Sequence, residues 1–266
     1  MSSSRRRCRS TSTAWPRSAT PWRRCSADGT SVKPRPEHRM VGRVAVVIPA
    51  GGVGARFGGR IPKQFVRIQR VPIVAMTVGH FARHPAVTAI VVAAPESHVE
   101  RTRRTLSSIA RRAPLSVVPG GRTRQDSVWL AMQAIPDDTD VIVVHDAVRP
   151  LITRLLIDAV VRAGAASGAA ICALPIAETV KRVRDDVVEA TLDRSELWAV
   201  QTPQAFRADL LREAHEKARR DGVVGTDDAM LVERLGHPVR VVRGLAENVK
   251  ITTPQDLRRA RRARVR

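Results

Sequence analysis

The chain has 266 residues, a formal net charge of +21 and only 3% aromatic residues. Its length suits one substantial α/β domain or two small domains, and we expect one domain with appendages. No apolar run reaches the roughly 18 residues that a transmembrane helix needs, so we expect no membrane span. The cysteines, Cys8, Cys25 and Cys172, are too few and too scattered for a disulfide framework or a zinc site, and they fit a cytoplasmic protein.

The positive charge is concentrated at the ends of the chain. Residues 1–39 carry nine arginines and one lysine against two acidic residues, a net charge of +8, and the C-terminal stretch RRARRARVR adds six arginines. A nucleic-acid-binding protein would interleave aromatic stacking residues with such cations, whereas this chain has no tyrosine. We therefore expect no specific nucleic-acid partner, and a basic nucleic-acid-binding module stays the non-enzyme alternative.

Residues 1–39 are rich in Ser, Arg and Pro and show no apolar periodicity, which predicts a disordered tail. Two explanations stay open for this tail. It is either an Arg- and Ser-rich transit peptide or the product of a start codon assigned too far upstream, with Met40 as the true first residue. Since Met40 lies four residues before the first predicted strand, we favour the second explanation. The folded domain is then expected to span residues 40–266.

From Val44 onward, short apolar runs alternate with patterns of helical period. The strands are expected at residues 44–48, 89–93, 141–144, 169–174 and 239–242, and the helices at residues 72–84, 125–135, 153–167 and 227–236. Thr226 is the expected N-cap of the last helix, and Gly236 its stop. Strands that are apolar on both faces belong in a covered, mainly parallel sheet, so the alternation predicts a Rossmann-like doubly wound α/β fold.

The segment 174–206 interrupts this alternation. Its β-branched residues, Val180, Val183, Val187 and Val188, flank a turn signal at Asp185-Asp186, which predicts a β-hairpin. A hairpin of this size, protruding from a core of sheet and helices, is either an arm or a lid.

The stretch PAGGVGARFGGRIPKQF, residues 49–65, directly follows the first predicted strand. It lacks the Gly-Lys-Ser/Thr of a Walker A motif and the third glycine of a dinucleotide fingerprint. What remains is Ala50-Gly51-Gly52 followed by Arg56 and Lys63. Glycines after a strand let backbone N–H groups approach an anion, so the stretch predicts a polyphosphate cradle. The alternative is a glycine-rich turn with two solvated cations.

Three further stretches place polar residues at predicted strand ends or helix starts. In VIVVHDAVRP, Asp146 follows a strand, where a carboxylate holds Mg²⁺ or a sugar hydroxyl, or caps a helix. We interpret His145 as structural. In GGRTRQDSVWLAM, Asp126 and Ser127 are either helix caps or contacts to a base edge. In ENVKITTPQDL, Lys250 precedes a helix that opens near Pro254.

Taken in order, these stretches resemble the 2-C-methyl-D-erythritol 4-phosphate cytidylyltransferase family of the non-mevalonate isoprenoid pathway, over about residues 43 to 262. The motifs that carry the resemblance are Ala50-Gly51-Gly52, Arg56, Pro62-Lys63, Gly121, Asp126-Ser127, His145-Asp146-Ala147, Arg149-Pro150, Thr179-Val180-Lys181, Asp193-Arg194, Gln201-Thr202-Pro203-Gln204, Thr226-Asp227 and Asn248-Val249-Lys250-Ile251-Thr252. Each motif is weak alone, and the whole ordered set is specific.

The resemblance implies transfer of CMP from CTP to methylerythritol phosphate with release of pyrophosphate. It also implies Mg²⁺ or another divalent cation, held mainly by the CTP phosphates, with Asp146 as a protein ligand. The CTP-binding residues it implies are Ala50, Gly51, Gly52, Arg56, Lys63, Gly121, Ser127, Asp146 and Ala147. Those for the second substrate are Asp146, Arg149, Thr179, Arg194, Thr202, Thr226 and Lys250. The implied catalytic residues are Arg56, Lys63, Arg194 and Lys250.

In the family the hairpin is an arm that reaches across a homodimer, so the resemblance implies that Thr179 and Arg194 serve the partner's active site. Three positions depart from the family's pattern. Gly51 stands where alanine is frequent, which keeps the backbone donors. Arg122 stands where an acidic residue can contact cytosine, and Glu247 replaces a frequent aspartate.

The expected chemistry needs no general base, because a phosphate monoester is already an anionic nucleophile at neutral pH. What it needs is cations that position two repelling anions and stabilise the transition state. Two enzyme alternatives stay open: a cytidylyltransferase for another sugar phosphate, such as ribitol 5-phosphate, and a guanylyl- or uridylyltransferase that shares only the first loop.

Overall fold

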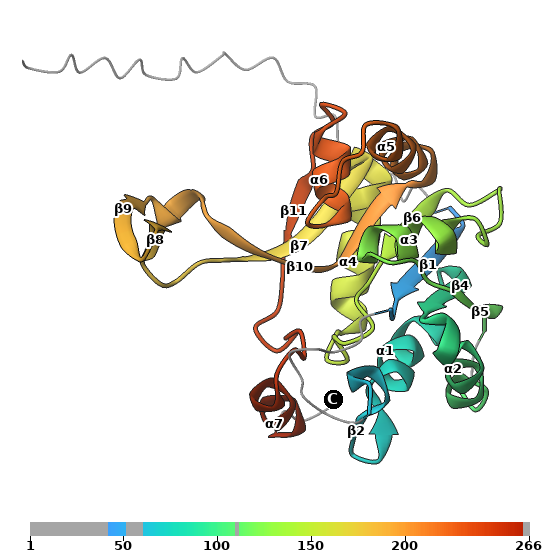
Figure 1. Cartoon of the computed structure of the whole chain (residues 1–266). Coiled ribbons are helices and arrows are strands. Elements are labelled where there is room, and N and C mark those ends of the chain that lie inside the picture. The colour runs from blue at the N-terminus through green and yellow to red at the C-terminus, as the bar shows by residue number, and fades with distance from the viewer. Residues whose placement is uncertain (1–41, 52–60, 110–111, 263–266) are drawn as a thin grey trace, which may run out of the picture. The chain divides into compact units, whose positions relative to one another are not determined.

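The computed structural model describes residues 42–51, 61–109 and 112–262, and a seven-stranded sheet lies at their centre (Figure 1). The strands follow one another across the sheet in the order β11-β7-β10-β6-β1-β4-β5. Their bounds are β1 Val44–Pro49, β4 Val87–Ala94, β5 Leu115–Pro119, β6 Val141–Val144, β7 Ala169–Pro175, β10 Trp198–Arg207 and β11 Arg240–Arg243. The expectations for residues 1–39 and for Met40 lie outside the described residues.

The sheet is mainly parallel. β1 pairs in parallel with β4 and β6, β4 with β5, and β11 with β7, whereas β10 runs antiparallel to both of its neighbours, β6 and β7. Helical crossovers connect successive parallel strands, as the alternation in the sequence predicts. The Rossmann-like doubly wound α/β fold is confirmed.

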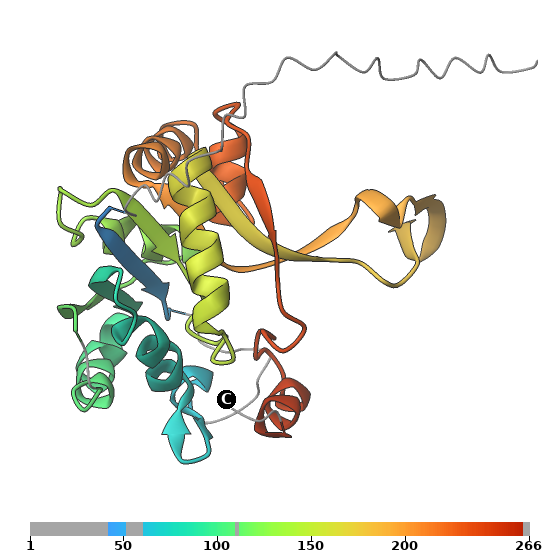
Figure 2. The same ribbon diagram turned by 180° about the vertical axis from the view of Figure 1, so that it is seen from behind.

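Helices cover both faces of the sheet (Figures 1 and 2). One face packs against α1 (Ile73–Ala82), α2 (Val99–Leu106) and α4 (Arg154–Ser167), and the other against α3 (Arg124–Met132), α5 (Ala208–Arg220) and α6 (Asp228–Glu233). Because side chains alternate along a strand, Val46 of β1 packs into the first cluster and its neighbour Val47 into the second. Strands buried on both faces explain why the sequence shows continuous apolar runs.

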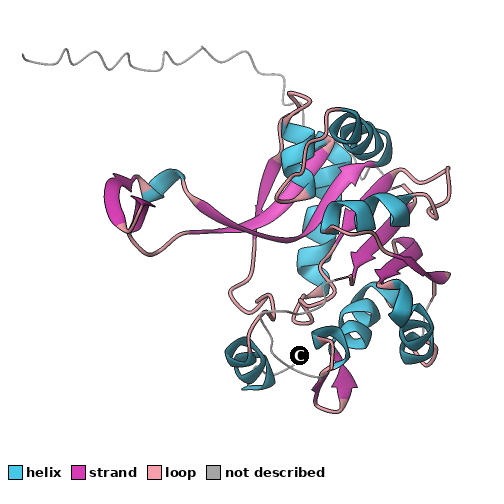
Figure 3. Ribbon diagram, viewed as in Figure 1, coloured by secondary structure: helices cyan, strands magenta, loops and turns pink. Residues whose placement is uncertain are grey.

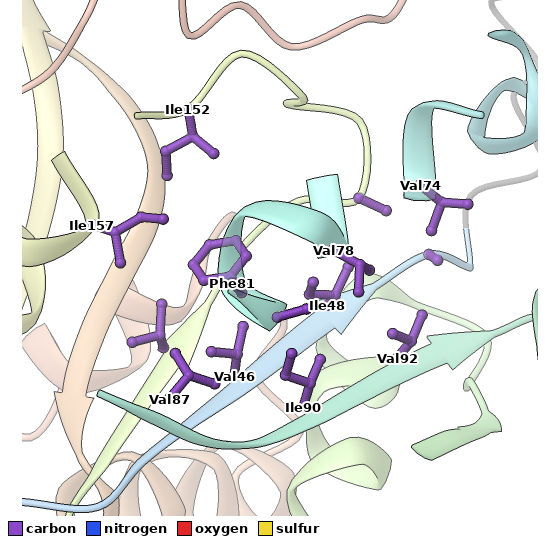
Figure 4. Packing of buried hydrophobic residues seen from close by; sticks show 14 of the residues in the cluster. Val46, Ile48, Val74, Val78, Phe81, Val87, Ile90, Val92, Ile152 and Ile157 are labelled. Atoms are coloured by element: carbon purple, nitrogen blue, oxygen red, sulfur yellow. The ribbon is translucent and has the colours of Figure 1, made fainter. Parts of the chain in front are cut away.

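The first cluster is the larger of these two cores. Phe81 and Val78 of α1 lie over Val46, Ile48 and Ile90 of the central strands (Figure 4), and all five are at most 1% exposed. Full burial of such side chains stabilises a fold by about 1.5–3 kcal/mol each. The core thus fixes β1, whose end carries the predicted phosphate cradle.

The predicted elements and the observed ones differ in a few places. All five predicted strands and all four predicted helices are present with ends shifted by a few residues, while β5, α2 and α5 had no sequence prediction. The N-cap of α6 is Asp227 rather than Thr226, because the Asp227 Oδ1 atom accepts the Met230 N–H at 3.0 Å. Gly236, with φ of 79°, follows the end of α6 as predicted.

The segment 174–206 contains a protruding hairpin, as predicted, but it is not hairpin throughout (Figure 3). Its ends belong to β7 and β10 of the main sheet, since Trp198 pairs with Pro175 and Gln201 with Cys172. The projecting part consists of β8 (Val180–Arg184), β9 (Val187–Leu192) and the short helix η4 (Arg194–Glu196). At its tip Asp185 and Asp186 have φ values of 48° and 61°, as a tight hairpin turn requires.

A third cluster anchors the end of the chain. α7 (Pro254–Arg262) packs with Leu257 and Ala260 against Ile68 of the small β2–β3 ribbon (Arg67–Ile68 and Val71–Pro72). Just before α7, the Ile251 N–H donates to the Val148 carbonyl at 2.9 Å. This contact holds the segment of Lys250 beside the loop that follows β6. Across the described residues, the helices are too short or too polar to cross a membrane.

Replacement of Gly164 by alanine tests the close packing of α4 on β10. A Cβ atom at this position would lie 2.6 Å from the Ala205 carbonyl oxygen. We expect Gly164→Ala to lower the free energy of unfolding by about 1–3 kcal/mol through this clash, although alanine favours a helix over glycine by about 1 kcal/mol. Urea denaturation measures the change. Arg162→Ala, at an exposed site of the same helix, should stay within about 0.5 kcal/mol, and a stabilised Gly164→Ala would contradict the packing argument.

Candidate active site

Two pockets open at the carboxyl ends of the parallel strands. The first has a volume of about 700 Å³ and lies among the residues that follow β1, β4, β5 and β6. The second, of about 430 Å³, lies between the end of β6, β10 and the start of α6. The pockets share Arg124, Asp146 and Lys250 in their linings. These three side chains therefore form the junction at which ligands in the two pockets would meet.

The first pocket brings together most of the residues predicted to bind a nucleotide. Its lining includes Ala50, Gly51, Lys63, Gly121, Ser127, Asp146, Ala147 and Lys250. Two further predicted residues, Gly52 and Arg56, lie outside the described residues. Arg122 also lines this pocket, together with Glu96 of the short helix η3 (Glu96–His98).

Ser127 organises the wall that follows β5. Its hydroxyl donates to the Thr123 carbonyl at 2.9 Å and accepts the Gly121 N–H at 3.2 Å. A Cβ atom on Gly120 would lie 2.9 Å from the same hydroxyl, so the turn needs glycine there. Asp126 is a helix cap, because it forms a capping box with Thr123 at the start of α3.

Lys63 is the first residue of a one-turn helix, η2 (Lys63–Phe65), whose other two residues hold the helix in place. The Gln64 side chain donates to the Ala50 carbonyl at 3.1 Å, which joins η2 to the end of β1. Phe65 stacks on His98 with 5.7 Å between ring centroids, and Arg101 covers the same phenyl ring at 4.2 Å. These contacts fix the backbone that presents Lys63 to the first pocket.

Asp146 is the centre of the junction, and three cations surround its carboxylate. Lys250 Nζ lies 3.0 Å from Oδ2, Arg149 Nε 3.5 Å from Oδ2, and Arg124 Nε 3.1 Å from Oδ1. Burial alone would raise the pKa of Asp146, but the charges of Arg124, Lys250 and Arg149 outweigh it and hold the pKa well below its usual range. Asp146 is therefore a permanent anion at neutral pH rather than a helix cap.

Arg124 is the main residue that the sequence analysis missed. It is the first residue of α3, and its Nη1 atom lies 2.7 Å from Asp228 Oδ2 while Nε contacts Asp146. Burial would lower the pKa of Arg124, yet the two carboxylates raise it further above its ordinary value. One signal was present in the sequence: a cation in the first turn opposes the helix dipole and needs a local reason.

His145 has a structural role, as predicted. Burial lowers the pKa of its imidazole to about 3, so the ring is neutral at pH 7. The Asp146 N–H donates to the Thr202 hydroxyl at 3.1 Å, this hydroxyl lies 3.1 Å from His145 Nδ1, and His145 Nε2 lies 3.1 Å from the Arg149 carbonyl. The chain of bonds ties the loop after β6 to β10 and orients Asp146.

The second pocket gathers most of the residues predicted for the second substrate. Asp146, Arg149, Thr202, Thr226 and Lys250 all line it. Arg149 is held from behind, since its Nη1 donates to the Asn248 carbonyl at 2.8 Å, and the Asn248 side chain in turn donates to the Thr202 carbonyl at 2.8 Å. Gln201, Gln204 and Asp227 also line the pocket and were not predicted as ligands.

The two predicted residues of the arm are not brought to these pockets within the chain. Thr179 and Arg194 are exposed and are absent from both described linings. Arg194 Nη1 donates to the Ala177 carbonyl, which fixes the guanidinium against the base of the hairpin.

The described residues contain no cluster of three or more His, Cys, Asp or Glu side chains that could hold a metal ion. A hard cation such as Mg²⁺ instead uses one or two carboxylates together with substrate phosphates. Asp146, an ionised carboxylate at the junction of the pockets, fits that mode of binding.

Comparison with known proteins decides the family. The family model described as IspD, 2-C-methyl-D-erythritol 4-phosphate cytidylyltransferase, matches residues 44–264. The chain belongs to this family. The resemblance seen in the sequence is thereby confirmed, and the protein is a nucleotidyltransferase enzyme.

Relatives and solved structures agree with the family model. The cytidylyltransferase of Symbiobacterium thermophilum is 48% identical over 218 residues, covering 82% of this chain and 91% of the relative, and that of Bacillus pumilus is 44% identical over 213 residues, covering 80% and 93%. The crystal structure of the Thermus thermophilus cytidylyltransferase matches with a TM-score of 0.68 at 34% identity, over 82% of this chain and 97% of that one. The 4-diphosphocytidyl-2C-methyl-D-erythritol synthase of Anaerococcus prevotii matches with a TM-score of 0.71 at 26% identity, over 83% and 97%.

The ion network of Asp146 and Asp228 makes stability depend on pH. Both carboxyls have a pKa in the folded state below the unfolded value of about 3.9. Their contribution is therefore complete above about pH 4 and is lost as the pH falls through the folded pKa values. Below about pH 6.5 the unfolded chain protonates His145 whereas the buried ring stays neutral, so the melting temperature should begin to fall there. It should fall more steeply below about pH 4, where the loss from the two carboxyls is added.

Arg124→Met removes the cation that these carboxylates share. We expect it to cost about 3–5 kcal/mol at pH 7, because it leaves two buried carboxylates poorly compensated. It should also reduce the part of the acid-induced loss that comes from these carboxyls, because their folded-state pKa values rise towards the unfolded value. Arg154→Met is the matched control: Arg154 is also the first residue of its helix but is 70% exposed, so its exposed ion pair should contribute at most about 1 kcal/mol. Equal effects of the two substitutions would argue against the network.

Proposed function

We propose that this chain transfers CMP from CTP to 2-C-methyl-D-erythritol 4-phosphate, releasing pyrophosphate, in isoprenoid precursor biosynthesis. Membership of the cytidylyltransferase family supports the reaction. The observation that carries it is the junction of two pockets at Asp146, Arg124 and Lys250. A reaction between two phosphorylated molecules needs such a shared cationic boundary.

We assign CTP to the first pocket and methylerythritol phosphate to the second. The first pocket, with about 700 Å³, offers the backbone of Ala50 and Gly51 at the end of β1 and the side chain of Lys63. The second, with about 430 Å³, offers Arg149 for a phosphate and Thr202 and Thr226 for hydroxyl groups. The larger volume suits the nucleotide, and the smaller volume suits a phosphorylated tetrol.

The reaction is a displacement at the α-phosphorus of CTP. An oxygen of the methylerythritol phosphate forms the new P–O bond, the bond to the bridging oxygen breaks, and pyrophosphate leaves with the electron pair. The nucleophile is already an anion, so the site needs positioning and charge stabilisation rather than a base. Bound Mg²⁺ would neutralise phosphate charge, and Asp146 is the residue that would hold it.

Lys250 is well placed to serve both anions. Its ammonium lies 3.0 Å from Asp146, and its side chain is 40% exposed, so it stays accessible from the two pockets that it lines. Lys63 also lines the first pocket, where it would stabilise charge on the triphosphate. Arg56 is proposed for the same role.

We further propose that the protein works as a cytoplasmic homodimer whose arm completes the partner's active site. Exposure of Thr179 and Arg194 supports this arrangement, as does the apolar surface of the hairpin, where Val183, Val187 and Val188 are 54 to 67% exposed. In the dimer, Arg194 would position the attacking phosphate together with Lys250.

Pyrophosphate release with CTP, Mg²⁺ and a panel of sugar phosphates tests the reaction. We expect turnover with methylerythritol phosphate, little with ribitol 5-phosphate, and a strong preference for CTP over GTP and UTP. Higher kcat/KM with ribitol 5-phosphate, or no CTP-dependent transfer at all, would contradict the proposal.

Lys63→Ala removes one cation from the triphosphate side. We expect kcat to fall by roughly a hundredfold or more, by analogy with the loss of a single transition-state donor. Lys217→Ala is a suitable control, since Lys217 pairs only with the exposed Asp221 side chain on α5 among the described contacts. Steady-state kinetics in which Lys63→Ala changes kcat by less than about threefold would remove it from the mechanism.

Mixing of two inactive variants tests the exchange of arms. Arg194→Ala damages the arm, and Lys250→Ala damages the pocket, so each homodimer should be nearly inactive. A hybrid dimer has one site with both defects and one intact site, and random pairing about a two-fold axis should restore about a quarter of the wild-type activity. If the mixture stays inactive although hybrid dimers form, the arm does not act on the partner.

A further inference from the structure

The ion network of the junction continues away from the pockets into the layer of helices on one face of the sheet. Asp228 Oδ2 contacts Arg124 Nη1 at 2.7 Å, and its Oδ1 atom lies 3.0 Å from His215 Nε2. The His215 and Asp228 side chains are 0% and 1% exposed. Arg124 begins α3, Asp228 begins α6 and His215 lies in α5, so three helices meet at this network.

The position of Arg124 runs against the local preferences of the chain. An arginine in the first turn of a helix is disfavoured by the helix dipole, whereas Asp228 in the first turn of α6 is favoured. Burial of charged groups also costs several kcal/mol per ion. Buried ion networks are therefore poor devices for stability alone, and a network that ends at the reacting junction points to a role in placing a side chain.

Two carboxylates determine the orientation of the Arg124 guanidinium. Nε and Nη1 of the guanidinium are held by Asp146 Oδ1 and Asp228 Oδ2, and Nη2 has no hydrogen-bond or ion-pair partner among the described residues. On the other side of Asp146, Lys250 and Arg149 take Oδ2. The Asp228 carboxylate thus orients Arg124. Because Arg124 binds Oδ1 of Asp146, the Oδ2 atom of the same carboxylate faces Lys250.

His215 is itself held in place. Its ring stacks on Trp129 of α3 with 6.4 Å between centroids and an angle of 19°. The Arg219 guanidinium lies over the Trp129 ring at 5.2 Å from its centroid. With the imidazole fixed, its Nε2–H donates to Asp228 Oδ1 and restricts the carboxylate to the rotamer that meets Arg124.

We propose that Asp228 and His215 are positioning residues for CMP transfer, which hold the Arg124 guanidinium at the boundary of the two pockets. Arg124 lines both pockets, so a phosphate in either lies within its electrostatic reach. This inference rests on the proposed function of the same site. It adds three residues to those predicted for the site from the sequence: Arg124, which lies at the junction, and Asp228 and His215, which line neither described pocket.

Asp228→Asn and His215→Gln test the positioning role in the full-length enzyme. Both keep approximate side-chain shape. We expect kcat to fall roughly ten- to hundredfold, with KM for CTP within about threefold of the wild-type value, while thermal unfolding shows a folded protein at the assay temperature. Asp221→Asn is the matched control, an exposed carboxylate at the end of α5 that pairs with Lys217, and it should leave kcat unchanged. A kcat within twofold of wild type in both test variants would overturn the proposal.

Chemical rescue separates positioning from loss of fold. Arg124→Ala removes the guanidinium. Added guanidinium ion at millimolar concentration should raise the kcat of this variant at least tenfold by occupying the space between Asp146 and Asp228. Arg124→Ala/Asp228→Asn should lose this recovery, whereas Arg124→Ala/Asp221→Asn should keep it. Equal recovery in the two double variants would show that Asp228 does not position the cation.

The outcomes also distinguish this inference from the proposed function. If the wild-type protein does not transfer CMP at all, the proposed reaction fails. If the wild type is active but the Asp228 and His215 variants match it, or rescue does not depend on Asp228, only the positioning role fails.

Discussion

The active site depends on one constraint: a buried carboxylate, Asp146, must stay ionised between the two pockets. Three cations from separate parts of the chain achieve this, with Arg124 at the start of α3, Arg149 after β6 and Lys250 before α7. Each of these segments is in turn fixed by the sheet or by α7. The fold can be understood as the means of bringing these charges to one point, since none of them is close to another along the sequence except Asp146 and Arg149.

The mainly parallel sheet supplies the edge at which this happens. Loops after β1, β5 and β6 open on the same side because parallel strands end together. The antiparallel strand β10 adds the second pocket. Its register with β7 shifts between Gln201 and Gln204. Thr202, within the shift, contacts Asp146 and His145 through its hydroxyl instead of continuing the ladder.

The sequence was sufficient for the fold class and the strand ends, because local patterns determine them, whereas most pocket residues were implied by the ordered set of motifs that resembles the family. Val44–Ile48 followed by glycines, and Val141–Val144 followed by Asp146, place their chemistry within a few residues of a strand. Two features were harder to predict. Arg124 is marked as unusual by its place in the first turn of a helix, but its partner Asp228 is 104 residues away, and no local pattern reports such a pair. β10 contains Pro203, which argues against a central strand until the register shift is known.

Because the arm continues directly from two strands of the main sheet, changes in its length are restricted. The hairpin grows directly out of β7 and β10, and Val200, at its root, precedes Thr202 of the second pocket by two positions. A single residue gained or lost in this stem would turn every following side chain of β10 to the opposite face and remove Thr202 from the site. Residues gained at the tip around Asp185 and Asp186 would leave that register intact. Variation in arm length is therefore confined to the tip, and the surface proposed to meet a partner can diverge without altering the chemistry at its base.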